Sequence, residues 1–191
     1  MRTARRILAA ARTIAVVEAS RDPMEPAHWV PKMLQEQGWR IIPVNPHAHR
    51  LIGEHVYGDL ADVPYAVDIV CVFRPSSEAP EIVRAAAAIG ARAVWLQRGI
   101  VSAQARRLAE AAGMDYVEDT CIGEERALSQ MVVGGLTPPG RVWHGIGPQP
   151  EPVPGRAAPS PSRTLERPVR RATRRRSGRK VDRRRSGARQ R

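Results

Sequence analysis

The chain has 191 residues, of which 42% are hydrophobic and 4% aromatic, and its formal net charge is +12. This charge is unevenly placed: from residue 139 onward 16 Lys and Arg stand against three acids, whereas residues 1–138 hold 15 basic and 16 acidic residues. The first part is therefore nearly neutral, and the excess positive charge belongs to the C-terminal part alone. Two cysteines exclude a disulfide framework, and no apolar stretch approaches the roughly 20 residues that span a bilayer, so we expect a cytoplasmic protein.

The N-terminal part predicts a helix, a strand and a phosphate-binding turn. Residues 1–12 are expected to form a short helix or a leader ahead of a domain at 13–134, and the continuous apolar run 14–17 is typical of a strand covered on both faces. Small and polar residues follow, ahead of Pro26, which can open a helix. In α/β proteins such a turn binds phosphate, because backbone N–H groups and a helix N-terminus point into it.

Strands and helices alternate from there to about residue 131. Pro31 indicates that the first of these helices starts late or kinks, and Pro43 predicts that the second strand lies at an edge. Ser76 or its neighbour is a candidate cap for the next helix, and Ser102 for the one after. The segment between the second and third strands predicts only short helical turns. The predicted strands are 14–17, 40–46, 68–73, 93–96 and 114–118, and the predicted helices are 26–37, 79–89, 103–112 and 123–131.

This alternation, with a glycine after most helices, predicts an α/β fold with right-handed crossovers: a three-layer, doubly wound parallel sheet of about five strands. The very apolar strand 68–73 is expected at its centre. Ligands bind outside the carboxyl ends of such strands, and here those ends carry small, polar and basic residues that suit a phosphorylated ligand. A classical nicotinamide dinucleotide site is excluded, because the first turn lacks Gly-x-Gly-x-x-Gly and the second strand ends in Asn45 rather than an acid.

The C-terminal part, residues 135–191, has a different composition. Pro and Gly crowd residues 138–161, and residues 163–191 are Arg-rich with almost no apolar side chains, so this tail is expected to be disordered. One hypothesis is that residues 163–191 bind nucleic acid non-specifically through phosphate contacts. The alternative is an extension without a selected role.

Six short segments of residues 13–131 carry distinctive motifs. They are VEASRDP (17–23), IIPVNP (41–46), GEHVY (53–57), DIVCVFR (68–74), VWLQRGI (94–100) and DTCI (119–122). In order and spacing they resemble the small stand-alone CoA-binding domain proteins. The same Rossmann-like fold forms the N-terminal domain of succinyl-CoA synthetase α subunits and of ADP-forming acyl-CoA synthetases.

The resemblance implies a CoA or acyl-CoA nucleotide lying across the strand ends. The protein would be a binding module and not an enzyme, because the sequence offers no nucleophile–base pair and no second domain for phosphohistidine chemistry. Arg21 is equally well interpreted as a phosphate contact or as a solvated loop arginine. By position in the motifs, the implied contacts are Ala19, Ser20, Arg21 and Lys32 for phosphate, Val44, Asn45 and Pro46 for the adenine side, Phe73, Arg74 and Ser76 for pyrophosphate and pantetheine, and Gln97 and Gly99 on the far side.

Three further features of the sequence are not explained by the implied CoA contacts. Glu18 stands where the resembling family usually has Gly, and its carboxylate beside the implied phosphates is expected to weaken CoA binding. Cys121 lies near the crevice as either a reactive or a structural thiol, whereas Cys71 is expected to be a buried hydrophobe. The His-rich segment 47–55 matches no metal-ligand spacing and is expected to be a polar loop.

Overall fold

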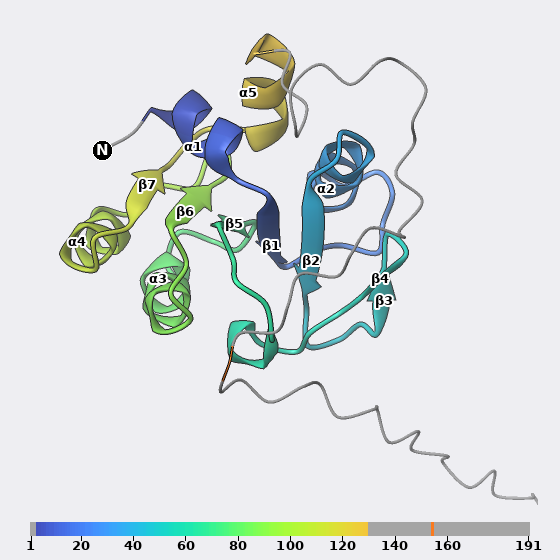
Figure 1. The fold of residues 1–191 in the computed structure, drawn as a ribbon, viewed down its shortest axis with the longest axis horizontal. Coiled ribbons are helices and arrows are strands. Elements are labelled where there is room, and N and C mark those ends of the chain that lie inside the picture. Colours follow the sequence, from blue (N-terminus) through green and yellow to red (C-terminus); the bar gives the residue numbers. More distant parts are fainter. Residues whose placement is uncertain (1–2, 130–153, 155–191) are drawn as a thin grey trace, which may run out of the picture. The chain divides into compact units, whose positions relative to one another are not determined.

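The apolar runs pair into one parallel sheet (Figure 1). The computed structural model describes residues 3–129 and Pro154, and in them the sheet has five strands in the order β2-β1-β5-β6-β7. Val17 at the end of β1 lies opposite Val44 of β2 and Val72 of β5, and every pairing in this sheet is parallel. The predicted α/β sheet is confirmed, with 68–73 at its centre. Its strands are β1 (Thr13–Val17), β2 (Arg40–Val44), β5 (Ile69–Val72), β6 (Ala93–Leu96) and β7 (Asp115–Val117).

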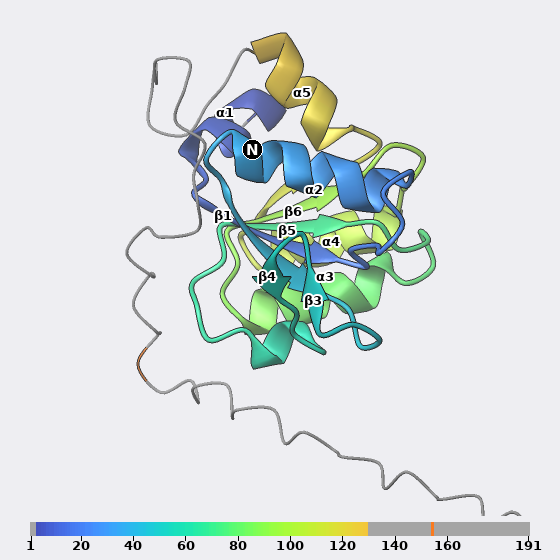
Figure 2. The ribbon, with the colours of Figure 1, turned by 90° about the vertical axis from the view of Figure 1, so that its right-hand side faces the viewer.

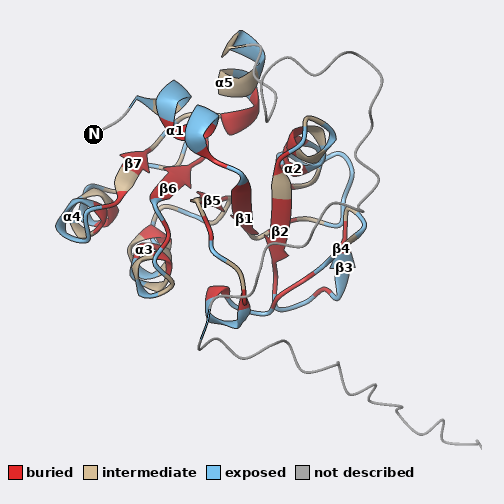
Figure 3. Cartoon of the chain, in the orientation of Figure 1, coloured by how far each residue is buried: buried red, intermediate tan, exposed pale blue. Residues whose placement is uncertain are grey.

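Helices cover both faces of this sheet (Figure 2). One face packs on α1 (Ala4–Ala10), α2 (Pro26–Glu36) and α5 (Ile122–Ser129), and the other on α3 (Ala79–Ala88) and α4 (Ala103–Ala111). Alternate strand residues serve the two cores: Ile14 and Val16 face the first, and Ala15 faces the second. Both sides of the strands are therefore buried, which explains why their sequences are apolar at nearly every position (Figure 3).

Proline and serine positions set where the helices begin. α2 starts at Pro26 and runs through Pro31, so a late start is wrong: the N–H that Pro26 lacks is not needed at the first helical position. Ser102 caps α4, as predicted, by accepting a hydrogen bond from Ala105 N at 3.2 Å. A serine cap on α3 is wrong, because Glu78 occupies the N-cap position without a side-chain hydrogen bond and the Ser76 hydroxyl bonds another loop.

The segment between β2 and β5 contains more than the predicted helical turns. Besides one turn of 3₁₀ helix, η1 (Leu60–Asp62), it forms an antiparallel hairpin of β3 (Arg50–Leu51) and β4 (Glu54–His55), whose two-residue strands are too short for a periodic signal. The segment then covers the sheet edge, since Tyr57 N donates to Pro43 O at 3.0 Å. β2 is an edge strand, as Pro43 predicted.

Several expectations fall on residues that are not described. They are the end of the last predicted helix, which α5 represents as far as Ser129, and the tail at 135–191 apart from Pro154. The hypothesis of nucleic-acid binding through residues 163–191 therefore stays a prediction. Within the described part, no helix is long and apolar enough to cross a membrane, and no group of three or more His, Cys, Asp or Glu side chains could hold a metal ion.

We predict that Asp68 is a main stabilising residue at the amino ends of the strands. Its Oδ2 accepts hydrogen bonds from Arg12 N, Thr13 N and Thr13 Oγ1 at 2.8, 3.0 and 3.1 Å. Asp68→Ala leaves the N–H groups of Arg12 and Thr13 without their acceptor and should lower the free energy of unfolding by about 2 kcal/mol in urea titrations. Glu81→Ala, which removes an exposed ion pair with Arg84, should change it by less than about 0.5 kcal/mol. Equal losses in the two variants would contradict the prediction.

Candidate functional site

A cavity of about 830 Å³ opens at the carboxyl ends of the strands. β1 and β5 are neighbours in the sheet, but the chain leaves β1 for α2 on one face and eventually leaves β5 for α3 on the other. The two connections diverge, which opens a crevice at the place where doubly wound proteins bind ligands. The cavity is lined by residues that follow each of the sheet's five strands, together with the first turn of α2.

Six of the twelve residues implied by the sequence lie in the cavity lining, and six do not. Ala19 and Val44 are buried in the cores, Lys32 is exposed on α2, and Ser76 and Gly99 bond neighbouring loops. The residues brought together are Ser20, Arg21, Asn45, Phe73, Arg74 and Gln97, and those outside the lining are Ala19, Lys32, Val44, Pro46, Ser76 and Gly99.

The turn after β1 is fixed against the start of α2. Pro31 has no N–H to donate to the carbonyl of Ala27 four residues earlier, and Ser20 N donates to that carbonyl oxygen instead, at 3.1 Å. The Ser20 hydroxyl accepts from Asp22 N at 3.0 Å, and His28 Nδ1 lies 2.8 Å from the Ser20 carbonyl oxygen. A proline inside a helix thus frees an acceptor that holds the predicted phosphate-binding turn in place.

Glu18 and Arg74 form an ion pair across the divergence of β1 and β5. Glu18 Oε2 lies 2.8 Å from Arg74 Nη1, and the other side of the guanidinium contacts Glu78 Oε2 through Nε and Nη2, each at 2.6 Å. Hydrogen bonding to Glu78, and then to Glu18, raises the pKa of Arg74 above its ordinary value. The carboxylate of Glu18 therefore has a cationic partner, which the sequence did not indicate.

The buried amides of Asn45 and Gln97 hold the strand ends together. Asn45 Nδ2 donates to Ala19 O at 3.0 Å, while its Oδ1 accepts from His47 N at 2.8 Å. Gln97 Nε2 donates to Cys71 Sγ at 3.0 Å, and its Oε1 accepts from Ile122 N at 3.3 Å. Both side chains line the cavity, but their polar atoms already serve the protein framework.

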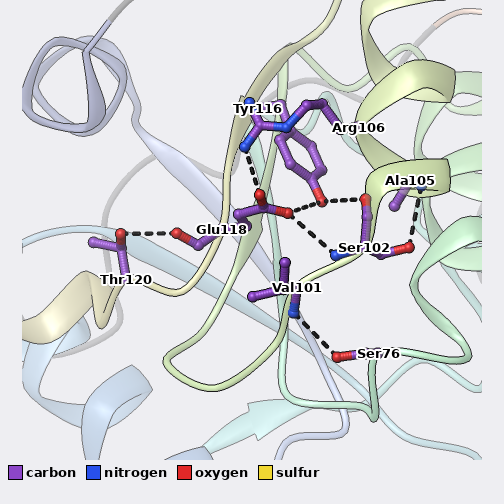
Figure 4. A network of polar contacts seen from close by, with 8 residues as sticks. All are labelled: Ser76, Val101, Ser102, Ala105, Arg106, Tyr116, Glu118 and Thr120. Carbon is purple, nitrogen blue, oxygen red and sulfur yellow. Dashed lines mark hydrogen bonds and ion pairs between the residues drawn. The ribbon is translucent and has the colours of Figure 1, made fainter.

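A polar network fixes the loop between β6 and α4 (Figure 4). Ser76 Oγ accepts from Val101 N at 3.0 Å, which ties this loop to the one before α3. The carboxylate of Glu118 accepts from Ser102 N at 3.2 Å and from Arg106. Burial alone would raise the pKa of Glu118, but its hydrogen bonds to Arg106 and Ser102 leave that pKa below the ordinary value. The carboxylate is therefore held ionised, and the loop keeps its position beside the cavity.

Sequence patterns did not identify several lining residues as contacts. Trp29 is 45% exposed on the first turn of α2, although helical spacing marked only the buried side of that helix. Arg98 pairs with Glu124 of α5, and only its place beside Gln97 at a strand end could have marked it. Glu18 and Cys121 also line the cavity, as their predicted places beside the crevice suggest, and the remaining lining residues outside the predicted set are Glu25, Pro26, Ala27, Trp29, His47, Pro75, Arg98, Ile100 and Glu124.

Comparison with known proteins identifies the family. The family model described as CoA binding domain matches residues 12–127. The chain belongs to the CoA-binding domain family. The Bacillus subtilis protein YneT is 32% identical over 124 residues, which are 65% of this chain and 92% of that protein. The resemblance seen in the six sequence motifs is confirmed.

Solved structures share the fold of this CoA-binding domain. The Thermus thermophilus protein called cell-free ID.343 is 40% identical, with a TM-score of 0.62 over 65% of this chain and 94% of that one. A dinucleotide-forming acetyl-coenzyme A synthetase from Ca. Korarchaeum cryptofilum is 22% identical, with a TM-score of 0.53 over 62% of this chain and 28% of that one. The second likeness shows the fold alone.

We predict that the two cysteines of this CoA-binding domain differ sharply in reactivity. Burial raises the pKa of the Cys71 thiol to about 12, whereas Cys121 is partly exposed and lines the cavity. Only thiolates attack disulfide reagents, so the folded chain should release one equivalent of thionitrobenzoate rapidly from Ellman's reagent at pH 8, and two after unfolding. Cys121→Ala should remove the rapid phase, and Cys71→Ala should keep it. Rapid release from the Cys121→Ala variant would refute this assignment.

Proposed function

We propose that this protein is a binding module for CoA or acyl-CoA, with no covalent catalytic step. The observation that carries the proposal is the cavity at the divergence of β1 and β5, in a chain of the CoA-binding domain family. Its volume of about 830 Å³ lies in the range of small-molecule sites, roughly 300–1,000 Å³. The phosphates would lie between the turn 18–22 and Arg74, whose guanidinium can form charge-assisted hydrogen bonds with them.

The two ends of the ligand are assigned from the positions of the residues in the family's sequence motifs. Asn45, with Val44 and Pro46 behind it, would flank the adenine beside β2. Phe73 and Gln97, with Ser76 and Gly99 supporting their loops, would flank the pantetheine beside β5 and β6. Ala19 and Lys32 would act from outside the lining, through the backbone and through long-range charge.

The contacts of the polar lining support binding rather than covalent catalysis. The Ser20 hydroxyl accepts a backbone hydrogen bond, and His28 contacts the carbonyl of Ser20 rather than its hydroxyl. A serine nucleophile needs a base within hydrogen-bond reach of its hydroxyl. Arg74 and Arg98 pair with carboxylates, an arrangement that suits exchange of ionic partners with a phosphorylated ligand.

We predict that Arg74 contributes directly to CoA binding by the 191-residue chain. Arg74→Met removes a charge-assisted contact to diphosphate and should weaken CoA binding about tenfold or more in isothermal titration calorimetry. Arg84→Met changes an exposed arginine on α3, away from the cavity lining, and should leave the affinity within twofold. Acetyl-CoA, which has no free thiol to react with Ellman's reagent itself, should also slow labelling of Cys121, which lines the same cavity.

The controls of this experiment separate specific from general effects. Thermal unfolding of each variant establishes that it is folded, and NAD serves as a comparison nucleotide. The proposal fails if millimolar CoA produces no heat and millimolar acetyl-CoA gives no protection of Cys121. It also fails if Arg84→Met costs as much affinity as Arg74→Met.

A further inference from the structure

Glu18 has an unusual backbone conformation. Its φ is 67°, in the left-handed region that glycine adopts freely and that glutamate rarely adopts. The strand register places it at the end of β1, beside the end of β5. Strain of this kind persists only where surrounding contacts enforce it, and it concentrates at ligand sites.

Two sets of contacts hold Glu18 in this conformation. Its N–H donates to Val44 O at 3.0 Å, which fixes the backbone, and its carboxylate bonds Arg74 Nη1 at 2.8 Å. Asn45 Nδ2 adds a longer contact, 3.5 Å, to the second carboxylate oxygen. The side chains of Glu18 and Arg74 are 36% and 38% exposed, so this pair lies at the cavity surface and a ligand can reach it.

Glu78 keeps Arg74 in place independently of Glu18. It bonds Nε and Nη2, whereas Glu18 bonds Nη1, so the two carboxylates occupy different sides of one guanidinium. If Glu18 moves away, Arg74 remains anchored by Glu78 and presents Nη1 to the cavity. An incoming anion then finds an arginine that is already oriented, and it must replace only one carboxylate.

We infer that Glu18 determines ligand specificity by acting as an internal competitor for the anion position on Arg74. This inference rests on the proposed function. A ligand that carries a diphosphate must displace the Glu18 carboxylate, whereas a ligand without phosphate leaves the ion pair intact. Glu18 therefore lowers the affinity for CoA and acyl-CoA relative to the pantetheine part alone, and it does so through Arg74.

The test compares two ligands with a set of full-length variants. CoA and pantetheine are titrated calorimetrically into the wild type, Glu18→Gln, Glu18→Gly and Glu25→Gln. Glu18→Gln keeps the size of the side chain and removes its charge, and we expect it to tighten CoA binding about fivefold, the value of a half-exposed ion pair. Glu18→Gly should tighten CoA binding at least as much, because the substitution also relieves the backbone strain at this position. Pantetheine affinity should stay within twofold throughout.

Two controls isolate the route through Arg74. Glu25→Gln removes another carboxylate of the cavity lining and should give no comparable gain. In a variant that already carries Arg74→Met, adding Glu18→Gln should give no gain in CoA affinity. Equal CoA affinities of wild type and Glu18→Gln, or an equal gain from Glu25→Gln, overturn the inference while CoA binding stands. If no variant binds CoA, the proposed function itself fails, and the inference with it.

Discussion

The divergence of the chain between β1 and β5 is the constraint on which the site depends. These strands pair in register along their length, but the chain passes from β1 to a helix on one face and from β5 to a helix on the other. No connection can then cross the gap between their carboxyl ends, which remains open to a ligand. The ion pair of Glu18 and Arg74 spans this gap, 56 residues apart in sequence.

The walls of the gap are held by polar side chains that are fully used inside the protein. Asn45 and Gln97 each bridge two neighbouring elements from a buried position, and the turn at Ser20 is tied to a carbonyl that Pro31 leaves free. A buried amide without hydrogen-bond partners would lower the stability of the fold. The amides of Asn45 and Gln97 therefore bond protein groups at the strand ends and are not free to bind a ligand. Recognition therefore falls to the arginines and the apolar lining.

The sequence predicts those features that repeat along the chain. Apolar runs and helix-ending glycines are local signals, and the edge and central strands follow because Pro43 marks an edge and strand 68–73 is apolar throughout. The β3–β4 hairpin has no such signal, since its strands hold two residues each. Likewise, Glu18 resembles an isolated carboxylate in sequence, and only the register of β1 against β5 brings Arg74 to it.

Charge balance within the cavity limits how it can attract a nucleotide. Arg21 bonds the carbonyl of His47, Arg74 pairs with Glu18 and Glu78, and Arg98 pairs with Glu124. Because the cavity lining also holds three carboxylates, those of Glu18, Glu25 and Glu124, the long-range field that would draw a polyanion is largely cancelled. A phosphate that enters gains only the difference between its own contact and the one it replaces. Affinity for a CoA-type ligand would then depend strongly on the apolar surfaces of Trp29, Phe73 and Ile100, which favour the part of the ligand that carries no charge.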